Sequence, residues 1–541
     1  MTTPPTTSSG PAAHLFATGV FDEPVNLMIP CPGLPAQEDD AGLQVEPTGL
    51  ATLKRVGIGA ESCLLVTMAK LDAGEDAEQE FCVKSGPAGD VVCRVVLRRT
   101  RCVINDALVR PEPSSPPLHP EMIAGVLWHS WRRFSEVVGL KRFTSGLGGS
   151  DVVVFRPRLS RPPALDPSFA GPDVPDVFNS SWGSPLLAKT GPACKVREEW
   201  NRFRVFLADR VHPFMSRSEN LYSVSLAETG SLPQAGGPPR ATIIGSFLGG
   251  DLLRAEALEN VILGGASAEL LDRLVARVFL VLSPWHTGGQ VAPLKKWWKM
   301  WHPGPKDASP SECKLFGKFD FTREADRERF RAPLMWDVAF GKEAHLHHHL
   351  LGRKRDGLIH RLLELEVQFS VIHGDLHPRN VLADPNDVWF LDFGETTVAP
   401  TLFDFAKLEI YARLWCLELK PEAHNFGDNV MQLERLLIDN FTDTEATLEP
   451  IRRIASHLGA SSEDLLRLCR VITSIRRHAV RFSNGAPDRR DYLAVLYLTA
   501  LNTLRYAGTD TASPDNFRLV TALCWQVEDI LSRMTGMEPF A

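Results

Sequence analysis

One stretch constrains the fold of this chain more than any other: VIHGDLHPRNVLADPNDVWFLDFGE, from Val371 to Glu395. Its apolar segments predict short strands over FSVIHGDL, VLAD and VWFLDFGE, and its turn-forming residues predict turns at HPRN and PND. Carboxylates lie within these apolar segments, although burying an unpaired carboxylate is costly. The stretch must therefore either neutralise its own charges or hold a charged ligand.

The hairpin-like strands predict that Asn380 and Asp392 reach one edge, at which Asp375 begins a loop. Two like charges about 4 Å apart repel by roughly 4 kcal/mol at an effective dielectric constant of about 20, and a divalent cation reverses the sign of that energy. An Asn carbonyl beside an Asp carboxylate suits Mg²⁺, which keeps waters and phosphate oxygens as its other ligands. We therefore expect Asn380 and Asp392 to hold Mg²⁺, and Asp375 to receive or orient the proton of a substrate hydroxyl.

The same residues carry a resemblance to a known family. HGDLHPRN matches the HxDxxxxN catalytic loop of the protein-kinase-like fold, and LDFGE matches its DFG metal site. The HGDL sequence, which contains Gly374, is most similar to the aminoglycoside phosphotransferase and choline kinase branch. The segment LFDFAKLE, which contains Asp404, also resembles this branch. The flanking text is similar to the bacterial ternary-complex-associated kinase-like domains. The resemblance spans residues 141–541 and implies an α+β, two-lobed protein-kinase-like fold with a small β-rich N-lobe and a large helical C-lobe.

A kinase of this kind needs a glycine-rich cover over the phosphates, a strand lysine and a helix glutamate. PLLAK supplies Lys189, and KVREEW supplies Glu199, with Glu198 as the neighbour that could be confused with it. SGLGGSDVVVF supplies the cover, because backbone amides beside glycine can approach a phosphate closely. The expected cover residues are Gly146, Gly148, Gly149 and Ser150.

An earlier set of residues offers an alternative. RVGIGAESCLLV followed by EFCVKSG would make Gly57, Gly59 and Lys84 the phosphate-binding elements. After Lys84 the chain continues as SGPAGDVVCRVVLRRTRCV, which contains no acidic helix to pair with the lysine, whereas Lys189 is followed by one. We favour Lys189 on this motif order and otherwise interpret the earlier glycines as a β-turn. A long polar insertion after Phe155 leaves the register of the cover loop open.

Composition divides the chain into four regions. Residues 1–45 begin rich in Pro, Thr and Ser and are expected to be disordered or extended. Residues 46–120 contain short β-rich runs and end in the linker RPEPSSPPLHP, which predicts an accessory β-rich region. Residues 121–250 are the expected N-lobe, beginning with a helix over EMIAGVLWHSWRRFSEVV. Residues 251–541 are the expected helical C-lobe with the catalytic and metal loops.

Charge and cysteine usage exclude several classes of protein. The net charge of −7 creates no field that would favour nucleic acid or an anionic membrane. No Lys or Arg precedes Lys54, and no run of 18 apolar residues occurs, so we expect neither a signal peptide nor a membrane span. The ten cysteines are scattered without a CxxC pair, which indicates reduced thiols and a cytoplasmic location.

Other chemistry-bearing residues have plainer interpretations. His377 and Arg379 are as well suited to a structural role as to phosphate contact, and His373 is expected to be structural. PLKKWWKMW could stack nucleic-acid bases, but its position favours a packed helix or substrate lid, and we expect no nucleic-acid partner. The HLHHHL run lacks an acidic partner at helical spacing, which favours a solvated segment over a metal site. Its histidines are His345, His347, His348 and His349.

These features predict an ATP- or GTP-dependent kinase that uses Mg²⁺ to phosphorylate a hydroxyl of a small molecule. In this interpretation Lys189, aligned by Glu199, contacts the nucleotide phosphates. One alternative is a catalytically weak nucleotide-binding module that regulates a protein partner bound through residues 1–120. Another is transfer of the nucleotidyl group, which the same motifs would also support.

Overall fold

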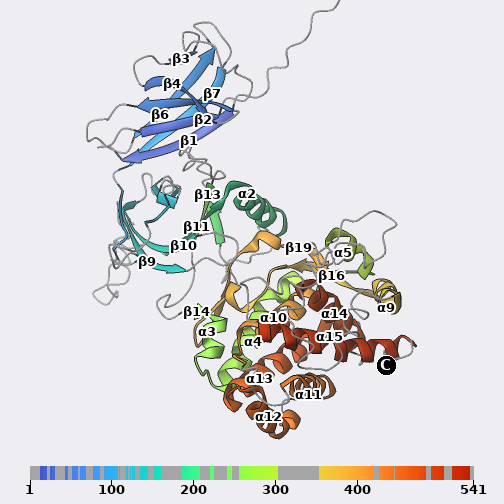
Figure 1. Ribbon diagram of the computed structural model, residues 1–541. Coiled ribbons are helices and arrows are strands. Elements are labelled where there is room, and N and C mark those ends of the chain that lie inside the picture. Colours follow the sequence, from blue (N-terminus) through green and yellow to red (C-terminus); the bar gives the residue numbers. More distant parts are fainter. Residues whose placement is uncertain are drawn as a thin grey trace, which may run out of the picture. The chain divides into compact units, whose positions relative to one another are not determined.

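The computed structural model divides into two compact units (Figure 1). One unit comprises Met1–Asn201 with Ser218–Leu253, and the other comprises Arg202–Arg217 with Arg254–Ala541. The first unit is rich in strands and the second is largely helical, which confirms the expected α+β class. The structure describes residues 13–20, 25–30, 43–46, 51–58, 61–68, 77–85, 91–100, 102–107, 109, 117–119, 122–123, 125–127, 134–143, 151–159, 185–207, 220–223, 240–246, 255–301, 353–419, 426–443, 445–482, 489–504 and 514–536.

Strands from the first hundred residues form two sheets (Figure 1). One sheet has the order β1-β7-β6-β3, with β1 and β7 parallel, and the other has the order β2-β5-β4. The strands are β1 (Ala13–Val20), β2 (Val25–Pro30), β3 (Leu43–Glu46), β4 (Ala51–Ile58), β5 (Glu61–Met68), β6 (Ala77–Ser85) and β7 (Val91–Thr100).

Two of these strands lie within residues 1–45, for which composition predicts disordered or extended chain. Strand β1 pairs with β7, and β2 pairs with β5. The segments AHLFATGV and VNLMIP are apolar enough to join a sheet once β7 and β5 provide partners. The Pro, Thr and Ser bias is strongest before Ala13, outside the described residues.

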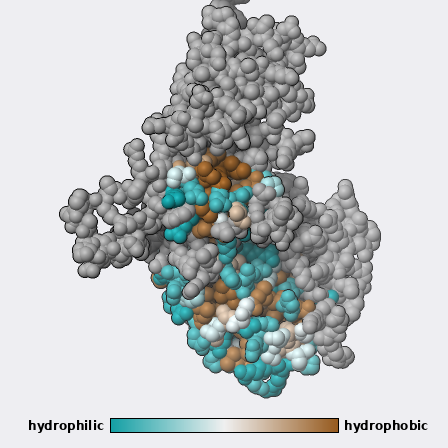
Figure 2. Space-filling model, turned by 90° about the vertical axis from the view of Figure 1, so that its left-hand side faces the viewer, coloured by the Kyte–Doolittle hydropathy of each residue, from teal (hydrophilic) through white to brown (hydrophobic). Residues whose placement is uncertain are grey.

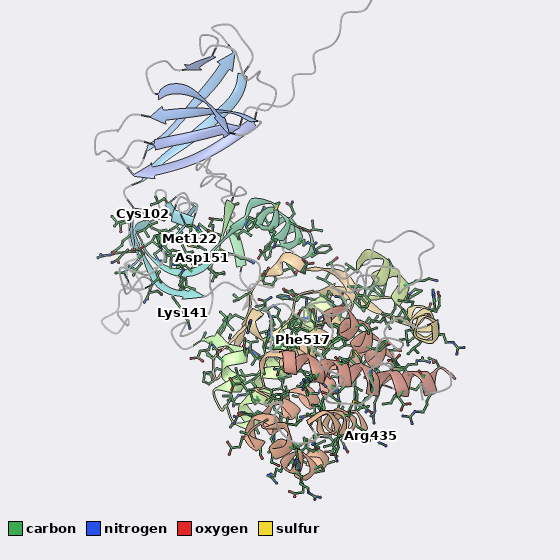
Figure 3. All side chains as sticks on the ribbon, in the orientation of Figure 1. Cys102, Met122, Lys141, Asp151, Arg435 and Phe517 are labelled. Atoms are coloured by element: carbon green, nitrogen blue, oxygen red, sulfur yellow. The ribbon has the colours of Figure 1, made fainter. Side chains whose placement is uncertain are left out.

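A larger sheet in the same unit has the order β12-β13-β11-β10-β9-β8. Its buried side chains, including Val153 and Phe155, pack with Met122 and Cys102 in one apolar core (Figure 3). Helix α2 (Ala193–Arg202) directly follows β11, and a π-helical turn, Phe203–Leu207, follows α2. The strands are β8 (Val103–Asn105), β9 (Phe134–Phe143), β10 (Asp151–Leu159), β11 (Leu186–Pro192), β12 (Asn220–Ser223) and β13 (Arg240–Ser246).

The prediction of a helix over residues 121–138 is wrong from Phe134 onward. The structure is helical at residues 122–123 and 125–127, but β9 begins at Phe134 and pairs antiparallel with β10. In the segment FSEVVGLKRF, the buried Val137 and Gly139 alternate with partly exposed neighbours, as in a half-buried strand. Pairing on both sides, with β10 and β8, therefore outweighs the helical pattern of the residues before it.

The second unit combines short strands with a helical body. Its strands form the sheets β14-β17-β18 and β15-β16-β19. They are β14 (Glu256–Ala257), β15 (Gln290–Pro293), β16 (Glu366–Ile372), β17 (Val381–Ala383), β18 (Val388–Phe390) and β19 (Thr397–Pro400). The helices are α3 (Leu258–Leu263), α4 (Ala268–His286), α5 (Leu294–Trp301), α9 (Arg353–Leu363), α10 (Leu402–Trp415), α11 (Phe426–Asp439), α12 (Glu445–Leu458), α13 (Ser462–Ala479), α14 (Arg490–Leu504) and α15 (Pro514–Met534).

The core of the helical body lies around α10 and α14. Helix α14 packs against both α10 and α15 (Figure 1). Nearly all of its side chains are buried. Phe517 on α15 is fully buried in this core, whereas Arg435 on α11 is exposed (Figure 3). The coloured surface in Figure 2 mixes hydrophobic and hydrophilic residues. Within the described residues, no helix is both long and apolar enough to cross a bilayer.

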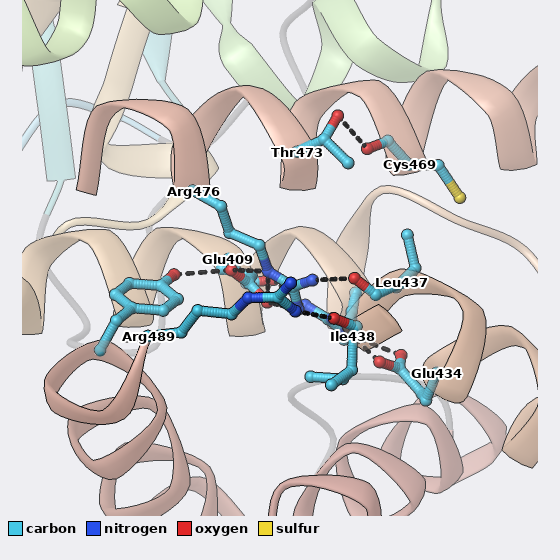
Figure 4. Close-up of polar contacts among 10 residues, drawn as sticks. Glu409, Glu434, Leu437, Ile438, Cys469, Thr473, Arg476 and Arg489 are labelled. Carbon is cyan, nitrogen blue, oxygen red and sulfur yellow. Dashed lines mark hydrogen bonds and ion pairs between the residues drawn. The ribbon is translucent and has the colours of Figure 1, made fainter. Parts of the chain in front are cut away.

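A buried network of charges ties these helices together (Figure 4). The Glu409 carboxylate on α10 accepts hydrogen bonds from Arg413 Nη1 (2.9 Å), Arg476 Nη2 (2.7 Å) and the Tyr492 hydroxyl (2.6 Å). Arg413 also donates two bonds to Glu434 on α11, at 2.8 and 2.9 Å. Burial alone would raise the pKa of Glu409, but the two guanidiniums hold it below its ordinary value. We call Glu409, Arg413, Glu434, Arg476 and Tyr492 the ionic cluster, and all five are fully buried.

Candidate active site

The loop after β16 is held in place by α10. The backbone N–H groups of His373 and Gly374 donate to the two oxygens of Asp404, at 2.8 and 2.9 Å. Asp404 is fully buried near the start of α10, where His286 Nε2 lies 3.4 Å from it. Because one carboxylate accepts from two consecutive amides, the path of the loop that carries Asp375 is fixed by this helix.

Gly374 is required at the start of this loop. Its φ is +79°, a region that L side chains rarely adopt, and a Cβ atom added there would lie 2.1 Å from the carbonyl oxygen of Glu395. The neighbouring His373 is structural, as expected, because its Nε2 lies 3.0 Å from the Leu391 carbonyl oxygen. Burial lowers the pKa of His373, although Asp404 and other nearby carboxylates oppose that shift.

We expect Gly374→Ala to destabilise the second unit by about 2–4 kcal/mol, from the strained φ together with the backbone clash. Gly288→Ala is the matched control, since Gly288 also has a positive φ, +72°, but has nothing within 4 Å of an added Cβ. The control should lose only about 1–2 kcal/mol. Denaturant unfolding of both variants measures the difference, and equal losses would show that the clash at Glu395 is relieved.

Asp375, in the second unit, is paired with a lysine and lies beside a histidine. Its Oδ1 forms an ion pair with Lys407 Nζ of α10, and its Oδ2 lies 3.6 Å from His377 Nε2. Asn380 Nδ2 donates to the same Oδ2 at 3.3 Å and to the Asp375 carbonyl oxygen at 2.9 Å. Burial alone would raise the pKa of Asp375, but Lys407 and His377 hold it well below its usual range. The carboxylate is therefore ionised, and its side chain is 27% exposed.

Asn380 and Asp392 lie at the same end of a hairpin. Strands β17 and β18 pair from Val381 with Phe390, and the Leu391 N–H donates to the Asn380 carbonyl oxygen at 2.9 Å. Asp392 follows with φ +63°, the one positive φ among the described non-glycine residues. Backbone strain of this kind costs about 1–3 kcal/mol and concentrates at functional sites. The structure thus brings Asp375 into contact with Asn380 and places Asp392 directly beyond their hairpin, while the roles of all three stay predictions.

The donor set at this hairpin suits Mg²⁺. The hydrogen bonds that Asn380 donates to Asp375 use the amide nitrogen, so the carbonyl-type oxygen is the atom suited to a cation. Asp392 adds a carboxylate, whose Oδ1 accepts the Gly394 N–H at 3.3 Å. Among the described residues, no group of three or more His, Cys, Asp or Glu side chains could hold a metal. A magnesium site at Asn380 and Asp392 stays a prediction.

In the first unit, Lys189 and Glu199 form an ion pair. Lys189 lies in β11, between β10 and β13, and its Nζ is 2.8 Å from Glu199 Oε2 on α2. Both side chains are largely buried, at 11% and 6% exposure, which strengthens their attraction. Glu198 is exposed instead, so Glu199 is the acid that faces the lysine. The pair expected from motif order is therefore present, and nucleotide binding by it stays a prediction.

The glycine-rich residues can be placed only in part. The predicted cover residues occur where β9 leads to β10, and those strands pair antiparallel up to Phe143 and Val152. In the alternative set, Gly57 lies in β4 and Lys84 in β6, where Lys84 pairs with residues of β3 and β7. Four predicted cover residues and one alternative lie outside the described residues: Gly146, Gly148, Gly149, Ser150 and Gly59.

Two residues near Asp375 have structural contacts. The His377 ring packs edge-on against Trp415 of α10, with centroids 4.8 Å apart, and its Nδ1 accepts the Asn380 N–H at 3.2 Å. The Arg379 guanidinium lies 4.1 Å above the Trp415 ring and forms an ion pair with Glu259. These contacts favour the structural interpretation over phosphate contact for both residues.

The structure describes one of the two remaining candidate segments, PLKKWWKMW, in part, and does not describe the other, HLHHHL. Trp297 of the PLKKWWKMW segment is buried against Phe403, with ring centroids 5.3 Å apart, as a packed helix predicts. The HLHHHL histidines lie outside the described residues. Sequence reasoning missed Lys407, although it stands three residues after Asp404 and so lies on the same helix face. That spacing was the available signal.

Part of the second unit matches a known protein family model. Residues 322–505, less than half of the chain, match a family model described as ternary complex associated domain 9. This match agrees with the resemblance of that segment to the ternary-complex-associated kinase-like domains. No curated protein matches the chain.

Several solved structures are weakly similar. Amicoumacin kinase hAmiN, in complex with AMP-PNP, Ca²⁺ and Ami, is 11% identical, with 77% of this chain and 94% of that chain covered and a TM-score of 0.34. Glucosamine kinase, in complex with glucosamine, ADP and inorganic phosphate, is 12% identical, with coverage of 65% and 79% and a TM-score of 0.31. Choline kinase from Cryptosporidium parvum Iowa II is 12% identical, with coverage of 74% and 92% and a TM-score of 0.31.

Proposed function

We propose that the chain is a cytoplasmic, Mg²⁺-assisted phosphotransferase that moves the γ-phosphoryl group of ATP or GTP to a hydroxyl of a small molecule. The observation that supports this best is the arrangement around the β17–β18 hairpin, where an ionised Asp375 contacts Asn380 and a strained Asp392 follows. The buried pair of Lys189 and Glu199 supplies the cation that phosphate binding requires.

The proposed step transfers one phosphoryl group. Asp375 orients the acceptor hydroxyl, whose oxygen forms a bond to the γ-phosphorus while the bond from that phosphorus to the β,γ-bridging oxygen breaks. The nucleoside diphosphate leaves with the electrons of that bond, and the hydroxyl proton passes to the Asp375 carboxylate and then to solvent. Lys189, aligned by Glu199, binds the nucleotide phosphates. Asn380 and Asp392 would hold Mg²⁺, which would supply positive charge to the phosphate oxygens.

Two alternatives use the same residues. In one, the chain binds nucleotide without turning it over and regulates a protein partner, for which residues 1–120 would be the interaction domain. In the other, the nucleotidyl group is transferred. The contact of Asp375 with Lys407 and Asn380 favours a transferase over the regulatory module, because an oriented, ionised carboxylate at this position suits catalysis. Product analysis separates phosphoryl from nucleotidyl transfer.

A metabolite screen tests the proposal. The full-length chain would be incubated with Mg-ATP or Mg-GTP and fractionated small-molecule extract, and mass spectrometry would detect any compound that gains mass. We expect one class of hydroxyl compound to gain a phosphoryl group with wild-type protein and none to do so with Asp375→Ala. Gain of a nucleotidyl group would support the second alternative. Tight nucleotide binding with no product, unchanged in Asp375→Ala, would support the regulatory module.

A further inference from the structure

Lys407 is a partly buried cation to which the proposed reaction assigns no role. It lies on α10, and its Nζ bridges two parts of the loop, forming an ion pair with Asp375 Oδ1 and donating to the Gly374 carbonyl oxygen at 3.1 Å. The side chain is 12% exposed. The rings of Phe403 and Tyr411 each lie 5.8 Å from Nζ, which keeps the charge in partly apolar surroundings.

The other basic side chains of the loop, Arg379 and His377, do not contact Asp375 Oδ1. Arg379 is engaged by Glu259 and the Trp415 ring. His377 contacts Asp375 through the opposite oxygen, Oδ2, which also accepts from Asn380. Among the described lysines and arginines, Lys407 is therefore the one that contacts the Asp375 carboxylate. It pairs with Oδ1, whereas His377 and Asn380 of the loop contact Oδ2.

A cation at this position could stabilise the negative charge that develops during phosphoryl transfer. Negative charge is spread over the equatorial oxygens of the phosphoryl group in the transition state, close to the attacking hydroxyl. An acceptor hydroxyl oriented by Asp375 must lie within hydrogen-bond reach of that carboxylate. A preorganised cation in contact with the same carboxylate is then near the developing charge, where it stabilises the transition state more than the ground state.

We propose that Lys407 is a second cation of the phosphotransferase site, which positions the Asp375 carboxylate and neutralises charge on the phosphoryl group during transfer. This inference rests on the proposed function and adds a residue outside both of the motifs on which that function is based. It also separates two tasks: Lys189 serves nucleotide binding, whereas Lys407 serves the transfer step.

Charge and hydrogen bonding at this position can be separated by substitution. Lys407→Gln keeps a donor for Gly374 but removes the charge, and Lys407→Arg keeps the charge. Lys295→Gln is the matched control, since Lys295 is an exposed lysine of α5 paired with Glu364. The readouts are the rate of γ-phosphate release from Mg-ATP to water with no acceptor present, the Kd for Mg-ADP, and thermal unfolding.

We expect Lys407→Gln to lower the rate about 100-fold, as loss of one transition-state donor does, with the Kd for Mg-ADP changed by less than about threefold. Lys407→Arg should return the rate to within about tenfold of wild type, and Lys295→Gln should match wild type. A merely structural role would instead weaken binding and thermal stability together with the rate. Equal rates for the Gln and Arg variants, or a Gln variant as fast as wild type, would overturn the inference and leave the proposed function standing.

A second measurement decides the matter if Lys407→Gln does not fold. Reductive ¹³C-methylation labels the lysines of the wild-type chain, and the Lys407 signal is assigned by its absence in Lys407→Arg. We expect this signal to shift when aluminium fluoride is added to the Mg-ADP complex to mimic the phosphoryl group, and a signal that does not shift overturns the inference. A wild-type chain that releases no phosphate and binds no nucleotide overturns the proposed function, and this inference with it.

Discussion

Replacing Glu409 with Gln should destabilise the helical unit by about 3–5 kcal/mol, because removing one member of a buried ion network leaves its partners buried and uncompensated. Arg476 and Arg413 both direct guanidinium groups at this carboxylate, and the Tyr492 hydroxyl donates to it. Glutamine keeps the size of the side chain but accepts through one oxygen and carries no charge. The ionic cluster would then hold two arginines against the single carboxylate of Glu434.

Glu449→Gln is the control for this experiment. Glu449 also pairs with two arginines, Arg452 and Arg453, but all three side chains are exposed on α12. Its replacement should change the unfolding free energy by less than about 1 kcal/mol. Urea denaturation with hydrogen exchange of peptides from α10 and α13 measures both variants, and a Glu409→Gln chain as stable as Glu449→Gln would contradict the account of the cluster.

The stability that the ionic cluster contributes should depend on pH. The pKa of Glu409 is lower in the folded chain than its ordinary value, so the unfolded chain binds the proton more readily. The stability that Glu409 contributes is therefore present above its ordinary pKa and is lost as the pH falls through its lower folded-state pKa. The difference in stability between wild type and Glu409→Gln should shrink over that acidic range.

Replacing Asp375 with Asn should lower the rate of phosphoryl transfer about 1,000-fold, within the range of 10²–10⁴ that general acid and base groups contribute. Asparagine has nearly the same shape, but it cannot accept the hydroxyl proton and leaves Lys407 without its ionic partner. Nucleotide affinity should change little, since the proposal assigns phosphate binding to Lys189.

The matched control is Asp529→Asn, which removes an exposed carboxylate paired with Arg533 on α15. Steady-state kinetics and a separate measurement of nucleotide Kd for both variants test the prediction. An Asp375→Asn chain that turns over as fast as Asp529→Asn would mean that Asp375 neither accepts nor orients the proton. A large fall in nucleotide affinity would mean that its role is binding.

Local patterns in the sequence predicted the parts of the site that lie close together along the chain. Turn residues and short apolar runs predicted the hairpin beside Asn380, and the order of strand, lysine and helix predicted the contact of Lys189 with Glu199. Where neighbouring sequence favoured one structure and distant pairing another, prediction failed. The segment at β9 is the example, because β10 and β8 turn a sequence that continues a helical pattern into a strand.

Residues that meet only in the folded chain gave no such signal. Lys407 reaches the loop residue Asp375 from α10, and only its spacing from Asp404 indicated the shared helix face. The ionic cluster draws its members from α10, α11, α13 and α14, whose relation no local pattern reveals. A buried carboxylate such as Glu409 is expected to be paired, but its partners could be identified only from the fold.

³¹P NMR of the reaction tests most directly whether the chain moves the γ-phosphoryl group of a nucleoside triphosphate. Full-length protein with Mg²⁺ and ATP or GTP, and the hydroxyl compound found by the metabolite screen, should give the nucleoside diphosphate and one new phosphomonoester signal. Without the acceptor, inorganic phosphate should replace that signal. Formation of pyrophosphate with a nucleotidyl product, or unchanged nucleotide beside a chain that binds it tightly, would contradict the claim.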